Sequence, residues 1–212
     1  MDASVVLWWC LLGFASGSVP FGYLLARAVG IDVRRSGSGN IGATNVARSA
    51  GAWLGILTLA ADTAKGVLPT WGALRTEPTA DLAAWVALAA VLGHIFCPWL
   101  RFRGGKGVAT AGGAMAVLAP GALVGALLLF LFVAWTTRYV SLASVAAAVA
   151  LPVLCFTLGC PRASFFVTVL LAVLITYRHR DNLGRLLEGR EPRFGEKRYS
   201  PPRAGHPPRR EQ

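Results

Sequence analysis

The stretch LRFRGGKGVAT, residues 100–110, indicates how the chain crosses a membrane, because it places three cations and three glycines between two apolar runs. Charged side chains are costly beside the hydrocarbon core of a bilayer, and glycine weakens a helix. The flanking runs, residues 82–100 and 107–118, are predicted to be helices. The stretch between them is therefore predicted to be a polar loop at one membrane surface.

Composition places the whole chain in a membrane. Of its 212 residues, 55% are hydrophobic and 15% are charged, and the mean hydropathy is +0.54. Soluble domains carry about 25% charged residues. Apolar runs long enough to cross a bilayer as helices recur along the chain, whereas the alternating pattern of a membrane β-barrel is absent. We predict an all-α integral membrane domain over residues 1–198 and a basic, Pro-rich, disordered tail over residues 199–212.

Seven transmembrane spans are predicted. Residues 107–136 form either one long span or two short ones, and Ala119-Pro120-Gly121 favours a turn between two. The predicted spans cover residues 5–27, 52–73, 82–100, 107–118, 120–136, 141–158 and 163–177.

Charge in the loops predicts the orientation. Cations concentrate in alternate loops, and the positive-inside rule assigns those loops to the cytoplasm. The N-terminus is then outside and the C-terminus inside. The net charge of +11 reflects either this topology, with its anionic headgroups, or an anionic substrate, and a nucleic-acid partner is not expected. The cations assigned to the cytoplasm are Arg34, Arg35, Arg48, Arg101, Arg103, Lys106, Arg138, Arg178 and Arg180.

The first of these loops, RRSGSGNIGATNVARSAG at residues 34–51, has the composition of an anion site. Glycine lets backbone N–H groups turn toward one point, and hydroxyl, amide and guanidinium groups add further donors. The alternatives are an ordinary Gly/Ser linker and, for the asparagines, turn or cap positions. The candidate binding residues are Ser36, Ser38, Asn40, Thr44, Asn45 and Arg48.

The opening stretch follows the logic of a phosphate loop. Gly104, Gly105 and Gly107 permit close backbone approach, and Lys106 supplies a point charge. A helix starting directly afterwards would add its N-terminal dipole. The pattern is not a Walker A motif, so ATP is not implied. The four cysteines follow no metal or redox spacing and are interpreted as packing residues, so no metal site is predicted.

Charged and polar side chains within or beside the spans are further candidates. Asp62 and Lys65 can pair on one helix face, either as a structural ion pair or as part of a site. His94 is either a structural or a catalytic histidine. Ser141 and Ser144, at the start of the sixth span, are read locally as caps and alternatively as site residues.

The segment after the last span, residues 178–195, is predicted to be an amphipathic interfacial helix with His179 and Asn182 on one face. Under the predicted topology it lies on the same side as both glycine-rich loops. Polar groups from three loops thus converge on the cytoplasmic side, which is how a membrane protein builds a site for a phosphate-bearing substrate.

Four ordered blocks carry a family resemblance: SGSGNIGATNVAR, DTAKG, GHIFCPWLRFRGGKGVAT and RHRDNLGRLLEGREPRFG. Over residues 16–195 the chain resembles the bacterial acyl-phosphate-dependent glycerol-3-phosphate acyltransferases. The resemblance implies a seven-span inner-membrane enzyme that transfers a fatty acyl group from acyl phosphate to the 1-hydroxyl of glycerol 3-phosphate. The products would be lysophosphatidic acid and phosphate, the entry to phospholipid synthesis, with no cofactor, acyl-CoA or acyl carrier protein.

The resemblance also implies residue roles. Lys106 with Gly104, Gly105 and Gly107 resembles the family's phosphate-binding loop. Ser144, His179 and Asn182 match polar positions that the family places around substrate. The positions that match the family's first motif are Ser36, Ser38, Asn40, Thr44, Asn45 and Arg48. The sequence does not distinguish which of Ser36 and Ser38 has the more important role.

The chemistry agrees with such a reaction. The sequence contains neither a GxSxG elbow nor a Cys/His nucleophile pair, and neither His94 nor His179 begins a His-x4-Asp motif. Acyl phosphate is already activated, so we predict direct attack by the glycerol hydroxyl, with a substrate phosphate or His179 accepting its proton and Lys106 stabilising the departing phosphate. The competing class is a transporter or channel for an organic phosphate. Transporters often contain inverted repeats, and the sequence shows none. A purely structural membrane subunit would not need the clustered polar loops.

Overall fold

Each of the seven predicted apolar ranges folds as helix in the computed structural model, which describes residues 2–77 and 80–195. Within those residues every element of regular secondary structure is a helix, and no strand is present. The predicted disordered tail, residues 199–212, lies outside the described residues. In chain order the elements are α1 (Ala3–Ser18), α2 (Phe21–Ala28), α3 (Ala43–Ala50), α4 (Ala52–Thr76), α5 (Ala80–Ile95), the 3-10 turn η1 (Pro98–Leu100), α6 (Val108–Leu118), α7 (Pro120–Thr137), α8 (Val140–Thr157), α9 (Arg162–Arg178) and α10 (Arg180–Leu187).

Four stretches of the described chain are long and apolar enough to cross a membrane. A fifth is obtained if α9 and α10, which meet at a 55° bend, count as one. The longest helix, α4, has 25 residues but carries Asp62 and Lys65 in its middle. The four stretches are Ala3–Ala28, Ala80–Leu100, Pro120–Thr137 and Val140–Thr157.

Prolines divide the apolar runs at two places. Residues 107–136 form two helices, as predicted: α6 ends at Leu118, Ala119 is extended with φ −152°, and α7 begins at Pro120. Proline suits a first helical position because its missing N–H would have no partner there. Pro20 likewise separates α1 from α2, so the first predicted span is a broken helix.

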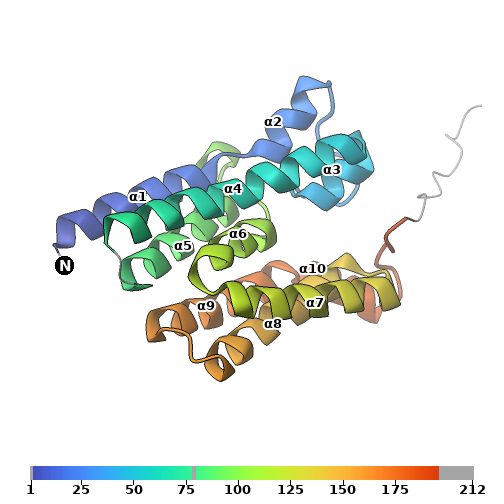
Figure 1. Ribbon diagram of the computed structural model, residues 1–212. Helices are drawn as coiled ribbons and strands as arrows, with labels where there is room; N and C mark the ends of the chain where they lie inside the picture. The colour runs from blue at the N-terminus through green and yellow to red at the C-terminus, as the bar shows by residue number, and fades with distance from the viewer. Residues whose placement is uncertain (1, 78–79, 196–212) are drawn as a thin grey trace, which may run out of the picture.

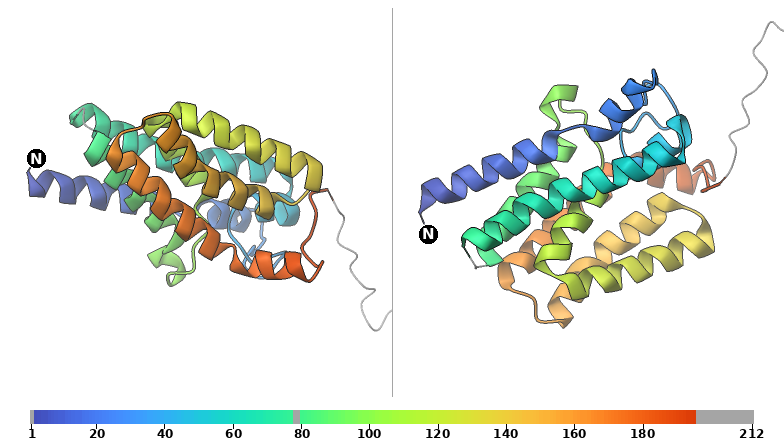
Figure 2. Two further views of the ribbon diagram at one scale, coloured as in Figure 1. Left: turned by 90° about the horizontal axis from the view of Figure 1, so that it is seen from below. Right: turned by 45° about the horizontal axis from the view of Figure 1, so that its top comes forward.

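The helices pack in two layers (Figure 1). Helices α1, α4 and α5 form one layer and α7, α8 and α9 the other, with α6 between them. Figure 2 shows the same arrangement from two further directions. The main buried cluster joins α5, α6, α7, α8 and α9 through apolar side chains such as Ala111, Met115 and Leu171. Large apolar side chains cover the outside, as expected where lipid replaces water.

Small residues let the helices of the first layer approach closely. A Cβ atom at Gly17 of α1 would overlap the carbonyl of Ala90 in α5, and one at Gly66 of α4 would overlap the carbonyl of Thr110 in α6. Such backbone contact is typical of packed membrane helices, whose association depends on close van der Waals fit. The α4–α6 contact also fixes where α6 begins, and therefore where the loop before it ends.

The polar segments gather at one end of the bundle. Helices α2 and α3 and residues 188–195 lie toward the end opposite the N-terminus (Figure 1). Helix α3 is a correction, because residues 34–51 were predicted as loop throughout. Helix α10 confirms a helix within the predicted interfacial segment, although it ends at Leu187 and the residues that follow are not helical.

Candidate active site

A cavity of about 360 Å³ opens at this polar end. Its walls come from α3 and the loop before it, α4, the start of α6, α7, α8, α10 and the segment after α10. Two carboxylates, Asp62 and Glu191, face a larger number of cations, so the lining suits an anion. The cationic side chains of the lining are Arg48, Lys106, Arg185 and Arg190.

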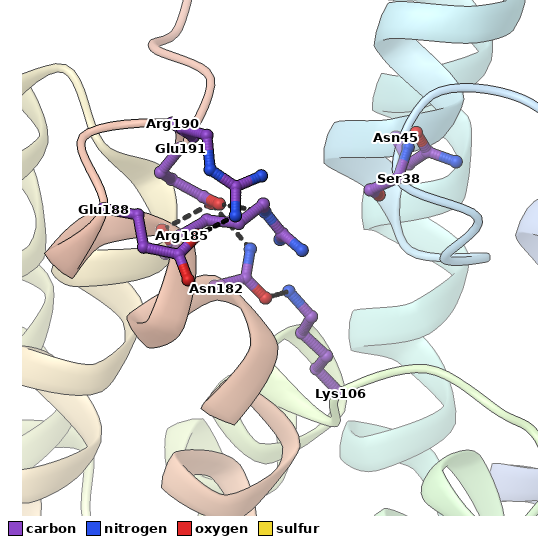
Figure 3. Close-up of polar contacts among 9 residues, drawn as sticks. Ser38, Asn45, Lys106, Asn182, Arg185, Glu188, Arg190 and Glu191 are labelled. Atoms are coloured by element: carbon purple, nitrogen blue, oxygen red, sulfur yellow. Dashed lines mark hydrogen bonds and ion pairs between the residues drawn. The ribbon is translucent and has the colours of Figure 1, made fainter.

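A chain of hydrogen bonds holds the lysine of the glycine-rich loop. Lys106 Nζ donates to Asn182 Oδ1 at 2.5 Å, and Asn182 Nδ2 donates to Glu191 Oε1 at 2.6 Å. Figure 3 shows Lys106 reaching toward Asn182 from the loop, with Glu191 above them. Asn182 is buried, so its amide is oriented by these two partners. The ammonium group is thus fixed at the cavity wall without a direct carboxylate partner.

Glu191 is the centre of this cluster. Its carboxylate also accepts from Ser141 Oγ at 2.8 Å and from Arg185 Nε at 2.8 Å. Partial burial acts to raise the pKa of Glu191, but the hydrogen bonds from Asn182, Ser141 and Arg185 outweigh it and leave the pKa below its usual value. Ser141 is therefore not a helix cap, since Tyr139 occupies that position without a side-chain bond.

The environment of Lys106 weakens its hold on a proton. Burial lowers the pKa of Lys106 to about 8, with Glu191 acting in the opposite sense and Arg185 and Arg178 adding repulsion. A bound anion would relieve that repulsion. The surroundings of Lys106 therefore favour an anion at this wall of the cavity.

The first two glycines of the loop do not direct their amides at an anion. Gly104 N–H donates to Ile95 O and Gly105 N–H donates to His94 O, both at 3.1 Å, so they close the C-terminal end of α5. The expectation of phosphate-binding N–H groups is wrong for these two. A Cβ at Gly104 would overlap the His94 carbonyl, and one at Gly105 would overlap the His94 ring. Their role is close packing beneath Lys106.

The helix predicted to start directly after the glycine-rich loop is present as α6. Gly107 has φ 84°, a left-handed conformation that favours glycine, and α6 begins at the next residue. Val108 and Ala109, in the first turn of α6, line the cavity together with Gly107. The positive end of the helix dipole therefore faces the cavity beside Lys106.

Asn45 organises the loop before α3. Its Oδ1 accepts from Ser38 N–H at 2.8 Å, and its Nδ2 donates to the carbonyls of Val33, Ser36 and Asn40. Asn40 is a turn residue, because its Oδ1 accepts from Gly42 N–H at 2.8 Å. Figure 3 shows Ser38 and Asn45 across from the Lys106 cluster.

The other candidates of this loop divide by position. Ser38, Asn40, Thr44, Asn45 and Arg48 line the cavity, whereas Ser36 does not. Ser36 instead contributes its carbonyl to Asn45. Of the two serines that the sequence left interchangeable, Ser38 is the one at the cavity.

His179 and Ser144 also line the cavity. His179 is buried at the junction of α9 and α10, and its Nδ1 lies 2.8 Å from the carbonyl of Ile175. A carbonyl only accepts, so Nδ1 carries the hydrogen and Nε2 of the neutral ring is a bare acceptor. Ser144 donates to the carbonyl of Val140 at 2.8 Å and is therefore within the helix rather than a cap.

Asp62, Lys65 and His94 form a buried group beneath the cavity. Asp62 Oδ1 lies 2.9 Å from Lys65 Nζ and 3.8 Å from His94 Nδ1. Lys65 Nζ also donates to the carbonyl of Val19 at 2.9 Å, at the break between α1 and α2. Asp62 and His94 line the cavity, whereas Lys65 does not. The predicted ion pair on one face of the helix is confirmed.

Sequence reasoning missed several residues of the site, among them Arg178, Arg185, Arg190 and Glu191. Arg178 donates to the carbonyls of Gly104 and Gly105 and holds the loop, while Arg185 and Glu191 build the cluster around Asn182. The sequence carried no clear signal for Glu191, because the segment 178–195 also contains Asp181 and Glu188. Its importance depends on partners from two helices, α8 and α10, and the partner in α8 lies 50 residues away in the sequence.

One wall of the cavity is apolar. Leu59 of α4, Phe130 of α7 and Val140 of α8 contribute to it. A ligand with one phosphate end and one hydrocarbon end would match both walls. Among the described residues, no group of three or more His, Cys, Asp or Glu side chains is placed to hold a metal ion.

Comparison with known proteins gives a consistent result. A family model described as glycerol-3-phosphate acyltransferase matches residues 7–189. A glycerol-3-phosphate acyltransferase of Trichlorobacter lovleyi is 44% identical over 188 residues, covering 89% of this chain and 97% of that protein. One of Geobacter sulfurreducens is 46% identical over 185 residues, covering 86% and 94%.

Solved structures also match. The crystal structure of PlsY, an integral membrane glycerol 3-phosphate acyltransferase, in its glycerol 3-phosphate form superposes with a TM-score of 0.87 at 39% identity, covering 90% of this chain and 96% of that one. Its lysophosphatidic acid form gives a TM-score of 0.84 at 38% identity, covering 90% and 95%. The similarity spans the bundle and the cavity.

Proposed function

We propose that this chain, which belongs to the glycerol-3-phosphate acyltransferase family, transfers a fatty acyl group from acyl phosphate to the 1-hydroxyl of glycerol 3-phosphate. The products are lysophosphatidic acid and inorganic phosphate. The observation that carries the proposal is a cavity with clustered cations at one wall and an apolar surface at another. The related PlsY structures in glycerol 3-phosphate and lysophosphatidic acid forms support the substrate and the product.

The reaction needs positioning and charge stabilisation rather than a protein nucleophile. The hydroxyl oxygen of glycerol 3-phosphate attacks the acyl carbon, and the bond from that carbon to the phosphate oxygen breaks, so that phosphate leaves with the electron pair. Lys106 and the start of α6 stabilise the departing charge. His179 Nε2, or a substrate phosphate, takes the proton of the hydroxyl. Asn182 and Glu191 act by positioning Lys106.

The fatty chain occupies the apolar side. Leu59, Phe130 and Val140 line the cavity there, and α4 and α7 carry lipid-facing side chains beyond it. The hydrocarbon chain of the donor then lies between these helices while its phosphate reaches Lys106. Both substrates carry phosphate, and the second set of contacts comes from Ser38, Thr44 and Arg48.

The topology that accompanies this function has seven spans in one catalytic domain over residues 1–198. The N-terminus is outside and the C-terminus is in the cytoplasm of a bacterial inner membrane, with the cavity facing the cytoplasm. The uneven distribution of loop cations supports this orientation. Glycerol 3-phosphate and acyl phosphate are water-soluble or interfacial anions, and a site at the cytoplasmic ends of the helices is accessible to both.

The purified protein in detergent tests the proposal directly. We would supply palmitoyl phosphate and radiolabelled glycerol 3-phosphate, with palmitoyl-CoA as a parallel donor. We expect labelled lysophosphatidic acid and an equal amount of phosphate from acyl phosphate alone. A folded protein that forms no product from either donor would contradict the proposal.

Arg48→Ala is expected to raise KM for glycerol 3-phosphate about tenfold or more, with kcat little changed. Arg48 is exposed on α3 at the cavity and forms no ion pair within the described chain, so its charge is available to the phosphate of glycerol 3-phosphate. That contact would be equally strong in the bound substrate and in the transition state, so its loss should affect KM and not kcat. Initial rates against glycerol 3-phosphate concentration measure this. Arg35→Ala, at the same end but outside the cavity, is the control. An unchanged KM would place the glycerol phosphate elsewhere.

The pH profile of kcat/KM is expected to fall above pH of about 8. The pKa of Lys106 is lowered to about 8, so the side chain is charged below that pH and neutral above it. Lys106→Arg keeps its charge throughout this range, so its remaining activity should lose the alkaline limb. Rates between pH 6 and 10, with folding checked at each pH, measure both profiles. The same alkaline limb in the arginine variant would assign it to another group.

A further inference from the structure

A second hollow, of about 430 Å³, lies apart from the active-site cavity and shares no lining residue with it. It lies between the loop after α2 and the turn that follows α5, where the chain passes through η1. Cationic and aromatic side chains make up most of its wall. The lining residues are Arg34, Trp99, Leu100, Arg101 and Arg103.

Two of its cations have no internal partner. The side chains of Arg101 and Arg103 are exposed and form no ion pair or hydrogen bond with the described residues. Arg34 differs, because it is paired with Asp32 at 3.1 Å and lies 4.5 Å above the ring of Tyr23. The hollow therefore has a fixed guanidinium on one side and two uncompensated ones on the other. An anion with several oxygen acceptors complements this arrangement.

The turn that presents these cations is held in place. Cys97 Sγ donates to the carbonyl of Ser18 at 3.0 Å, and Trp99 Nε1 donates to the Ser18 hydroxyl at 3.1 Å. Arg101 and Phe102 are consecutive left-handed residues, with φ 53° and 61°. Non-glycine residues adopt this conformation only where the surroundings enforce it. The hollow is thus a preformed feature anchored on the end of α1.

Aromatic side chains place the hollow at the surface of the bilayer. Trp99 is 72% exposed and Phe102 is 64% exposed, at the end of the bundle where α5 terminates. Exposed aromatic rings at the ends of membrane helices lie at the level of the lipid headgroups. In Figure 2 the light-green segment between α5 and α6 projects from the side of the bundle.

We propose that this hollow binds the phosphate headgroup of an anionic membrane phospholipid, with the lipid chains alongside Trp99 and Phe102. Charge complementarity supports an anion, and the exposed aromatic rings support a lipid rather than a free ion. Loop cations that only set topology would need neither a hollow nor a fixed turn. The proposal does not depend on the acyl transfer reaction, because the hollow and the active site have separate residues.

Native mass spectrometry of the purified full chain, titrated with phosphatidylglycerol or phosphatidylcholine, tests the proposal. The test variant is Arg101→Gly with Arg103→Gln, since glycine retains the left-handed backbone while both charges are removed. The matched control is Arg35→Gln with Arg180→Gln, which removes two exposed charges outside the hollow. Arg103→Gln alone serves if the double variant does not fold.

We expect wild type to bind phosphatidylglycerol at least about tenfold more tightly than phosphatidylcholine, and the hollow variant to lose that preference. The control should retain the preference within about threefold. An equal loss in both variants would show diffuse surface attraction and overturn the proposal. Thermal stabilisation of wild type by inorganic phosphate, absent in the hollow variant and accompanied by no lipid preference, would assign the hollow to a free anion instead.

Discussion

Lys106→Ala is expected to lower kcat/KM for acyl transfer by about a thousandfold while the protein remains folded. Its ammonium group is the cation that the Asn182–Glu191 chain fixes at the cavity wall, beside the start of α6. Alanine would remove the charge that stabilises the leaving phosphate. The loop itself should persist, because Gly104 and Gly105 bond to α5 and Arg178 bonds to their carbonyls.

Lysophosphatidic acid formation and thermal unfolding in detergent, measured on the same preparation, separate these two effects. Arg35→Ala is the control, since its side chain is 88% exposed at the same end and should change neither quantity much. Near-normal turnover in Lys106→Ala would show that the departing charge is stabilised by other groups. A large fall in Tm would show that the lysine is structural.

Breaking the buried pair in α4 is expected to have the largest effect on stability. Asp62→Asn leaves Lys65 without its carboxylate in the interior of the bundle, which should cost about 3–5 kcal/mol. Lys65→Met should cost a similar amount, because it isolates Asp62 and removes the donor to the Val19 carbonyl. Both side chains are almost fully buried, so solvent does little to compensate either loss.

A double-mutant cycle with Asp62→Asn, Lys65→Met and the combination measures this coupling through Tm and unfolding in denaturing detergent. We expect the double variant to lose much less unfolding free energy than the two single variants lose in total. Asp62 also lines the cavity, so a second reading exists. Asp62→Asn protein with wild-type Tm but no turnover would contradict the structural role and make Asp62 part of the reaction site.

The helices could be predicted because hydropathy records them directly. The ranges from 52–73 to 163–177 fold as helices close to the predicted bounds, except that α5 ends at Ile95 and the predicted range 82–100 finishes in the separate turn η1. Pro120 separates α6 from α7, as its missing N–H requires. Helix α3 could not be predicted in the same way. Its eight residues are flanked by glycines, and it depends on burying Asn45 and Val46 against the rest of the protein.

The candidate site was predictable in its members but not in their geometry. Lys106, Asn182, His179 and Ser144 line one cavity although the sequence separates them widely. The function of Gly104 and Gly105 could not be predicted from sequence, because a glycine whose amide binds an anion and a glycine whose amide closes a helix end look the same in a sequence.

The central role of Glu191 could not be predicted for a different reason. Glu191 gains its significance only from Ser141, Asn182 and Arg185, which belong to α8 and α10. A local pattern contains none of that information. Its three partners become neighbours only after the last helices have packed.

The position of Glu191 has a consequence for biosynthesis. The ribosome completes Lys106 halfway along the chain, but the carboxylate that orients its partner Asn182 is synthesised 85 residues later. Membrane insertion proceeds from the N-terminus, so a nascent chain holds both glycine-rich loops while the lysine still lacks its support. A nonsense codon after α9 would therefore yield an inserted protein with an incomplete site. The synthesis of Glu191 therefore sets the earliest moment at which the site can be complete.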